Sequence, residues 1–297
     1  AARFVLGARP EPLAPVEGEA TLPERWIHSR LSATIERATR QLDELDLAGY
    51  AATVYDFAWS DYCDWFLETA KIDLRREEAS LGERARTWRT LADVLAATLR
   101  LLHPILPFVT EEIWATLREV NAEATAGERL LISAAWPAPA ARDVGAEDAM
   151  QRVIAATREV RDLRTQQQLP AGEWRSVRVA SGSAQAEDIL RQAEPYLGQL
   201  WRARPLEILL AAATHDFPEH AAATALGYAW IEAGGAEVQR AAQRAQKQRA
   251  ELEEQIRRVR GLLASEGFLA KAPPQVVQRE RERLAELEER LAGLDVQ

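Results

Sequence analysis

The residues that could carry out catalysis are few in this chain, and their spacing does not assemble a recognisable reaction centre. The 297 residues include four histidines and one cysteine, and Cys63 alone can form neither an intrachain disulfide nor a cysteine-based zinc site. His215 and His220 flank Glu219, but Pro218 between them denies this segment the helical face that a zinc site would need. We therefore expect no metal site, no cofactor and no catalytic centre in this chain.

The remaining reactive side chains are better explained by structural roles. His103 precedes Pro104 at the expected end of a helix, where an imidazolium interacts favourably with the helix dipole. Cys63 lies in an apolar helical stripe, which favours a buried and unreactive thiol. No glycine-rich phosphate loop or nucleophile elbow occurs in the sequence. The pattern indicates a protein that binds and positions a partner.

The basic residues are more informative. Arginine supplies 34 of the 37 basic residues, and its planar guanidinium suits phosphate and base contacts better than lysine does. A GC-rich genome would produce the same bias and is the simpler explanation. The whole chain has a net charge of −9, which argues against a generally basic nucleic-acid binder, whereas residues 236–297 carry 12 basic and 11 acidic groups. Within that segment Arg240, Arg244, Lys247 and Arg249 form a stretch without an acid.

Length and hydropathy limit the class of protein. A chain of 297 residues predicts two or three domains. No apolar run approaches the ~20 residues of a membrane span, and no secretory leader opens the sequence. With a single cysteine, the protein is expected to be cytoplasmic and to have no membrane segment.

Residues 236–297 have the apolar spacing of a two-helix coiled coil. Their apolar residues recur at alternating three- and four-residue steps, break near Gly267 and Pro273, and then resume. A helix over residues 236–263 would extend about 42 Å at ~1.5 Å per residue. We refer to residues 236–297 as the arm, and we expect it to project and contact a partner.

Residues 21–120 have the helical periodicity of four antiparallel helices. Capping boxes at Thr21/Glu24 and Ser80/Glu83 open the first and third helices, and Thr110 is predicted to cap the fourth. The second helix is expected to run without a break over residues 50–76. Four tryptophans are expected in the core of this bundle, namely Trp26, Trp59, Trp88 and Trp114.

The region between the bundle and the arm has a mixed pattern. A helix over about residues 146–168 is followed by a strand over 174–180, two short helices over 186–193 and 196–201, and a strand over 206–210. An extended stretch over 223–231 is expected to pair with these strands. The predicted fold is mainly α, with a helical bundle at 1–140, a small α/β subdomain at 141–235 and an antiparallel coiled-coil hairpin at 236–297.

Three blocks of the bundle resemble class I aminoacyl-tRNA synthetases. They are ERWIHSRL at residues 24–31, YDFAWSDYCDWFLETAK at 55–71 and HPILPFVTEEIW at 103–114. Together they are similar to the anticodon-binding helical domain of the valine, isoleucine and leucine enzymes. In the arm, EGFLAKAP at residues 266–273, followed by Val276-Val277 and Glu280-Arg281, resembles the C-terminal coiled coil of the valyl-tRNA synthetase family.

The resemblance implies that the chain is the tRNA-recognition portion of a valine–tRNA ligase. The class signatures His-Ile-Gly-His and Lys-Met-Ser-Lys-Ser are absent, so ATP-dependent aminoacylation and editing are expected in another part of the parent enzyme. ATP would be a cofactor of that parent, and no cofactor is expected here. The implied partner is the valine-accepting tRNA, bound by a monomer.

The resemblance also directs attention to the residues that would contact RNA. Anticodon bases are single-stranded and can stack on aromatic or guanidinium planes. In the bundle and the α/β subdomain the candidates are Trp65, Lys71, Arg75, Arg76, Arg158, Arg161 and Arg164. A core position is favoured for Trp65, and a solvated face with Glu159 and Asp162 as ion-pair partners is an equal alternative for the last three arginines.

In the arm, the candidates for contact with the outer corner of tRNA are Arg240, Arg244, Lys247 and Lys271. Such contacts would add affinity with little sequence information, and a plain solvated face explains them equally well. Two other identities stay open at this point. A helical adaptor would use the hairpin to bind a protein, and the isoleucine enzyme is disfavoured because the chain lacks zinc ligands and has the arm.

Overall fold

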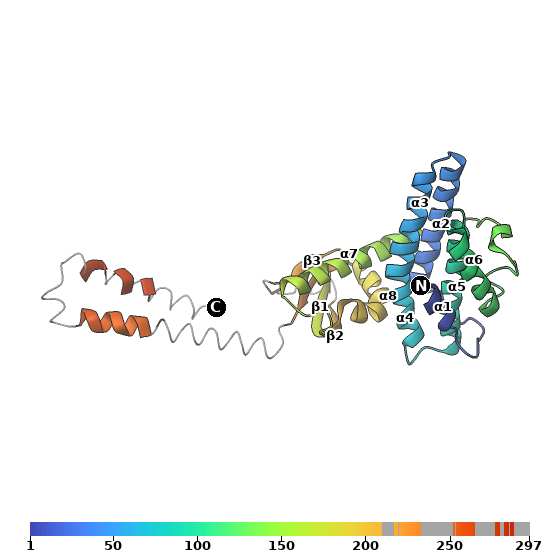
Figure 1. Ribbon diagram of the computed structural model, residues 1–297. Helices are drawn as coiled ribbons and strands as arrows, with labels where there is room; N and C mark the ends of the chain where they lie inside the picture. The colour runs from blue at the N-terminus through green and yellow to red at the C-terminus, as the bar shows by residue number, and fades with distance from the viewer. Residues whose placement is uncertain are drawn as a thin grey trace. The chain divides into compact units, whose positions relative to one another are not determined.

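In the computed structural model the chain forms two compact units, residues 1–231 and 232–297 (Figure 1). The structure describes residues 1–209, 217–218, 220–232, 252, 254–264, 277–279, 282–284 and 286–287. The four candidates in the arm, Arg240, Arg244, Lys247 and Lys271, lie outside the described residues. The domain boundaries expected near residues 140 and 235 stay predictions.

Antiparallel helices make up the first part of unit 1–231, as the periodicity predicted. A short helix precedes them, and the second predicted helix consists of three consecutive segments. The elements are α1 (Ala2–Gly7), α2 (Leu22–Asp43), α3 (Leu47–Asp56), a π-helix (Phe57–Phe66), α4 (Leu67–Arg75), α5 (Leu81–Leu102) and α6 (Pro107–Val120).

The starts of α2 and α5 follow the predicted capping chemistry. At α5, the Glu83 backbone N–H donates to Ser80 Oγ at 3.1 Å, and the Ser80 N–H donates to the Glu83 carboxylate at 2.8 Å. At α2, the Thr21 N–H donates to the Glu24 carboxylate at 2.8 Å. These bonds satisfy backbone donors that the first helical turn leaves unpaired.

The predicted cap of α6 is wrong. The helix begins at Pro107 with Leu106 as its N-cap residue, so Thr110 lies one turn inside it and is buried. Its Oγ1 donates to the Leu106 carbonyl at 2.8 Å and lies 2.8 Å from Nδ1 of His103. Proline suits the first helical position because its missing N–H would be unpaired there anyway, and this advantage outweighs the threonine cap.

The π-helical segment was not predicted. In a π-helix the N–H bonds to the carbonyl five residues earlier, which widens the turn relative to an α-helix. The consecutive residues Trp65, Phe66 and Leu67 are therefore all buried, at 6, 1 and 6% exposure. In a regular α-helix with 3.6 residues per turn, three consecutive side chains point in different directions and are not expected to be buried together. The helical periodicity therefore could not identify this segment.

The core of the bundle contains three of the four expected tryptophans. Trp26, Trp88 and Trp114 are buried, and Trp88 Nε1 donates to the Val5 carbonyl of α1 at 2.9 Å. Trp59 contradicts the prediction, because 58% of it is exposed and it stacks on Tyr55 at a centroid distance of 6.2 Å. Two residues are about half a helical turn, so Trp59 points away from the face on which Phe57 is buried.

The second part of unit 1–231 is a small α/β region, as predicted, and consists of a mixed sheet with two helices (Figure 1). The sheet order is β2-β1-β4-β3, with β1 parallel to β2 and antiparallel to β4. Helix α7 contacts α2, β3 and β4, whereas α8 contacts α7, β1 and β2. The elements are α7 (Val144–Gln166), β1 (Arg175–Ser181), α8 (Ala184–Trp201), β2 (Ala203–Leu209), β3 (Ala222–Thr224) and β4 (Gly227–Ile231).

One helix occupies the place of the two short helices that were predicted. Helix α8 continues through Pro195, because its apolar residues keep the helical spacing on both sides of the proline and are buried. Tertiary burial of that face compensates for the backbone hydrogen bond that proline removes. The extended stretch near residue 223 forms the β3–β4 hairpin and pairs with β1, which confirms that prediction.

The β3–β4 hairpin depends on Gly227, and we expect the Gly227→Ala substitution to lower the free energy of unfolding by about 2–4 kcal/mol. Gly227 has a φ of +135°, and a Cβ there would lie 2.0 Å from the Ala180 carbonyl oxygen and 2.6 Å from the Gly182 nitrogen. Urea denaturation would measure the loss. Gly172→Ala is the matched control, because its Cβ would meet no atom within 4 Å, and an equal loss in both variants would refute this account.

The described residues of unit 232–297 partly reproduce the predicted seam. Residues 254–263 are helical, and Leu252, Ile256, Val259 and Leu287 form one buried apolar cluster with Leu263 and Leu284 packed against it. Their spacings, 252–256–259–263 and 284–287, are the three- and four-residue steps that predicted the seam. The complete coiled-coil hairpin stays a prediction, because most of its length lies outside the described residues.

Candidate nucleic-acid interface

Helix α7 positions the candidate residues, and polar contacts at its start attach it to α2. Its N-cap, Asp143, accepts a hydrogen bond from the Ala146 N–H at 2.9 Å and pairs with Arg25 of α2 at 3.1 Å. Ser29 of α2 donates to Glu147 at 2.5 Å and accepts from the Asp143 N–H at 2.9 Å. The Arg142 guanidinium, together with the smaller effect of the Ser29 hydrogen bond, holds the pKa of Glu147 below its usual range.

Arg158 and Arg161 of α7 are exposed, and both lie over the indole of Trp65. Their guanidinium carbons are 6.0 and 5.7 Å from the ring centroid, within the range of a cation–π interaction. Among the described residues neither arginine has a carboxylate within ion-pair distance. The alternative in which Glu159 pairs with them is not observed, since Glu159 accepts a hydrogen bond from the Ala225 N–H at 2.8 Å.

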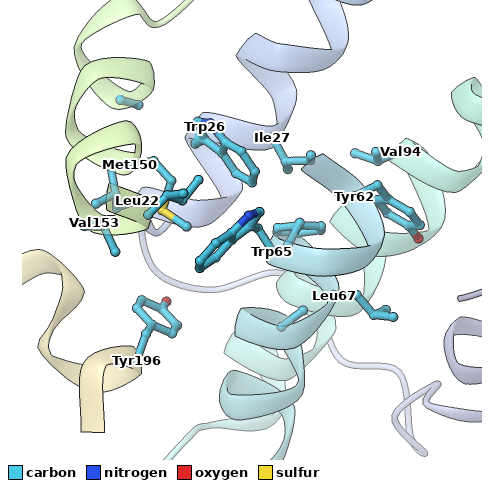
Figure 2. Packing of buried hydrophobic residues seen from close by; sticks show 14 of the residues in the cluster. Leu22, Trp26, Ile27, Tyr62, Trp65, Leu67, Val94, Met150, Val153 and Tyr196 are labelled. Carbon is cyan, nitrogen blue, oxygen red and sulfur yellow. The ribbon is translucent and has the colours of Figure 1, made fainter. Parts of the chain in front are cut away.

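Trp65 itself is buried, as the more favoured expectation had it. Figure 2 shows its ring among Leu22 and Trp26 of α2, Met150 of α7 and Tyr196 of α8, all members of the same buried cluster. With 6% exposure it has no open face on which an RNA base could stack. It packs beneath Arg158 and Arg161, whose guanidiniums lie over its ring.

Arg164 differs from its two neighbours, because it is turned into the protein. Its residue exposure is 6%, and its guanidinium donates to the carbonyls of Trp201 at 3.4 Å, Pro170 at 3.1 Å and Glu173 at 2.5 Å. Helical spacing puts it one turn after Arg161, but the chain that follows α7 folds over it. Arg164 therefore holds that turn in place, and we do not include it among RNA contacts.

The three candidates on α4 have different environments. Lys71 pairs with Glu68 at 2.6 Å and lies 5.5 Å from the ring of Phe4. Arg76 pairs with Glu83 at 3.3 Å and lies 3.8 Å from Asp73. Arg75 is exposed and, among the described residues, has no ion-pair partner. Of the three, only Arg75 has a guanidinium that is free to bind an anion.

A cavity of about 450 Å³ lies where α4, α7 and the end of α8 meet. The lining residues include the cations Arg161, Arg164 and Arg202, the polar Thr165 and Gln199, and the apolar Ile72 and Leu200. A second cavity of about 360 Å³ shares Glu68, Ile72 and Gln199 with it and adds the three basic residues of α4. Five of the seven candidate residues thus line one or other of two adjoining cavities, namely Lys71, Arg75, Arg76, Arg161 and Arg164.

A second cluster of arginine and tryptophan was not predicted from the sequence. The guanidinium carbons of Arg202 and Arg204 lie 5.5 and 4.6 Å from the ring centroid of Trp174. Neither arginine has a carboxylate partner among the described residues. A signal was present, since the run Trp201-Arg202-Ala203-Arg204 contains no acid, and that criterion was applied only to the arm.

A buried carboxyl connects α4 to α8 beside these cavities. Tyr196 Oη donates to Asp73 Oδ2 at 2.9 Å, and Asp73 is 5% exposed. Burial raises the pKa of Asp73 to about 6, although the hydrogen bond from Tyr196 and the nearby Arg76 and Arg86 oppose the shift and Glu24 reinforces it. The native state therefore binds this proton more tightly than the unfolded chain, whose carboxyl has a pKa of about 3.9.

We expect a pH-dependent loss of stability from this carboxyl. Because the folded-state pKa is raised, the free energy of unfolding should fall as pH rises from about 4 to 6, by roughly 2–3 kcal/mol for this group. Asp73→Asn keeps the acceptor for Tyr196 and should remove that component. The difference between wild type and variant isolates it, and Asp188→Asn on the exposed side of α8 is the control. Parallel pH profiles would contradict this assignment.

Two general features of the described residues bear on the kind of site. No group of three or more histidine, cysteine, aspartate or glutamate side chains that could hold a metal ion was found in the part of the chain that the structure describes. Within the same part, no helix combines the length and apolar character that crossing a membrane requires.

Comparison with known proteins identifies two families along the chain. Residues 24–179, more than half of the sequence, match the model of the anticodon-binding domain of tRNA ligase. Residues 237–296 match the tRNA binding arm of valyl tRNA synthetase. The first match contains Trp65 and both α7 arginines, and the second contains the four arm candidates.

Curated relatives agree with both matches. The chain is 36% identical to the valine–tRNA ligase of Thermus thermophilus over 288 residues, which cover 96% of the chain and 30% of that protein. It is 34% identical to the Dehalococcoides mccartyi enzyme over 99% of the chain and 33% of that protein. The chain thus spans about a third of the length of the curated relatives it matches. By residues 24–179 the chain belongs to the family of tRNA ligase anticodon-binding domains, and its arm and its curated relatives are similar to valyl-tRNA synthetases.

Proposed function

We propose that this chain recognises valine-accepting tRNA on behalf of a valine–tRNA ligase. The bundle and the α/β subdomain would bind the anticodon stem-loop, and the arm would bind the outer corner of the tRNA. The observation that carries the proposal is the pair of exposed, carboxylate-free guanidiniums of Arg158 and Arg161 over Trp65, inside the region that matches the anticodon-binding family.

The chemistry of that pair suits RNA. A guanidinium that lies over an indole and pairs with no carboxylate can still offer its N–H groups to phosphate oxygens and its outer face to a base. Because it is already ordered, less side-chain entropy is lost when RNA binds. Arg75, exposed on α4, extends the cationic surface toward the second cavity. These three residues, with Lys71 and Arg76 as secondary members, form the proposed anticodon-side surface.

The arm would act by different physics. As an antiparallel coiled-coil hairpin it would carry Arg240, Arg244 and Lys247 on a face away from the seam, with Lys271 near the turn. Contacts of this kind go to phosphates, which add affinity for any tRNA and select none. Selection of the valine acceptor would therefore depend on residues 1–235.

The remaining parts of the proposal concern the parent enzyme. ATP-dependent aminoacylation and editing would take place in the part of the enzyme that this chain does not match, and ATP would bind there. The chain would act as a monomer in the cytoplasm. It needs no metal or cofactor for the contacts proposed here.

Deleting residues 236–297 tests whether the arm supplies affinity for any tRNA while residues 1–235 select the valine anticodon. We expect the deletion to weaken binding of all tRNAs by a similar factor, about 10-fold or more at low salt, because phosphate contacts are lost. Preference for the valine anticodon should survive in residues 1–235. Filter binding with valine tRNA, an anticodon-substituted copy and an unrelated tRNA, over a salt series, would measure both effects.

Footprinting of the full chain on valine tRNA provides the complementary measurement. Protection is expected at the anticodon loop and at the outer corner where the D and T loops meet. No preference for the valine anticodon in the binding series would refute the proposed specificity. Capture of a stoichiometric protein partner in the absence of RNA, with no protection of tRNA, would favour a helical adaptor instead.

A further inference from the structure

A tryptophan and two arginines come together at the start of the sheet, outside the residues discussed for the anticodon. Arg202 is the C-cap of α8 and has a left-handed backbone conformation with a φ of 54°. Its carbonyl accepts a hydrogen bond from the Arg175 N–H at 3.0 Å, which brings the chain after α8 beside the chain before β1. This backbone pairing positions Arg202 and Arg204 against Trp174.

Both guanidiniums are held in place without neutralisation. Arg204 is exposed and Arg202 is half-buried, and among the described residues neither forms an ion pair. Elsewhere on α8, Arg191 pairs with Glu187 and lies 3.9 Å from Asp188, which is the usual arrangement for a surface arginine. Two fixed cations over one indole, with no carboxylate to balance them, form a local site for an anion.

The cavity between α4, α7 and α8 joins this cluster to the one over Trp65. Arg161 and Arg202 both line it, so one cation of each cluster faces the same space. Its volume of about 450 Å³ falls within the range of small-molecule pockets, about 300–1,000 Å³. The apolar lining residues and the groups of Thr165 and Gln199 suit a flat ring with polar edges.

The cavity also contains acids, which restrict how a ligand could lie. Asp64 and Glu68 line the side formed by the π-helix and α4, and Glu68 is paired with Lys71. A phosphate would be repelled by these carboxylates and attracted to Arg161 of α7 and Arg202 at the end of α8, which also line the cavity. A carboxylate such as Asp64 can accept the exocyclic N–H of a base, as acids do from cytosine N4.

We propose that this cavity binds a single unstacked nucleotide of RNA, with its base toward Asp64 and Gln199 and its phosphate between Arg161 and Arg202. Arg204, held over Trp174, binds the next phosphate of the same strand. The inference rests on the proposed function, since it assigns a nucleotide pocket and the exit path of the strand to the RNA-binding surface. It adds Trp174, Arg202, Arg204 and Gln199 to that surface.

The test compares two double variants of the full chain with the same net charge. Arg202→Asn/Arg204→Gln removes the proposed phosphate contacts, and asparagine tolerates the left-handed conformation at position 202. Arg152→Gln/Arg191→Gln removes two arginines that are already paired, with Asp148 and with Glu187. The probe is a hairpin RNA with the anticodon stem and loop of valine tRNA, with each loop base in turn replaced by an abasic nucleotide.

We expect the Arg202/Arg204 variant to bind the intact hairpin about tenfold or more weakly and to lower the salt slope by about 1–2, with little change in the control. At one loop position, the abasic replacement should weaken hairpin binding by wild type roughly tenfold, because base contacts are lost. The same replacement should weaken hairpin binding by the Gln199→Ala variant much less. Arg204→Gln alone repeats the test at an exposed residue if the double variant unfolds.

Two failures are distinguishable. If wild type does not bind the hairpin, the proposed function fails and the nucleotide pocket fails with it. If wild type binds and the Arg202/Arg204 variant matches the control, the anticodon-side function stands and the pocket is refuted. Equal abasic profiles in wild type and Gln199→Ala would refute the placement of the base.

Discussion

Replacing both Arg158 and Arg161 by glutamine is expected to weaken binding of the valine anticodon hairpin by about 10- to 100-fold, which is about 1.4–2.8 kcal/mol. Each guanidinium that contacts a phosphate of a single strand displaces counterions, so the slope of log affinity against log salt should fall by about 0.7 per contact. The effect is large because neither cation has an internal carboxylate that already uses its charge. Fluorescence anisotropy of a labelled hairpin over a salt series would measure both quantities.

A lysine variant separates charge from geometry. Arg158→Lys/Arg161→Lys keeps both charges but loses the planar fork and most of the stacking on Trp65, so it should restore the salt slope and only part of the affinity. Arg152→Gln is the matched control on the same helix, because Arg152 is already 3.3 Å from Asp148. A glutamine pair that binds like this control would remove the α7 surface from the proposal.

The largest expected effect on stability comes from Arg86. We expect Arg86→Met to lower the free energy of unfolding by about 3–5 kcal/mol, because it leaves a buried carboxylate without its cation. Glu24 is 1% exposed and accepts hydrogen bonds from Arg86 Nε at 2.9 Å, Thr87 Oγ1 at 2.9 Å and the Thr21 N–H at 2.8 Å. The pair connects the start of α2 to α5.

Urea denaturation followed by tryptophan fluorescence would measure the loss, since all nine tryptophans lie in unit 1–231. Arg191→Met breaks an exposed pair on α8 and should cost less than about 1 kcal/mol. The double variant Glu24→Gln/Arg86→Met should regain much of the stability, because it removes the uncompensated charge. A single variant as stable as the Arg191 control would contradict the role of the pair.

The bundle could be predicted well because its determinants are local. Ser80 and Glu83 cap α5 through side chains three residues apart, and the stripe on α2 follows the helical period. The predicted helix boundaries were wrong where a local sequence preference competed with a stronger interaction. Pro107 begins α6 in place of Thr110, and Pro195 lies inside α8 because the buried face of that helix outweighs the lost backbone bond.

The candidate site was less predictable, because whether a charged side chain is exposed, paired or buried depends on which distant parts of the chain pack beside it. Arg158, Arg161 and Arg164 are equivalent in the sequence, yet the turn that ends near Glu173 covers only Arg164. Trp65 was a plausible base platform, and packing against α2 and α7 turns it into a support under the arginines.

The amino-acid sequence by itself determined most of the helices, the caps of α2 and α5 and the family resemblance, because these follow from residue types at short spacings. Only the tertiary structure decided which cations remain available to a ligand. Arg202 and Arg161 are 41 positions apart and line one cavity because α7 and α8 pack together. The proximity of two residues so far apart in the sequence depends on long-range packing, which local residue spacing does not encode.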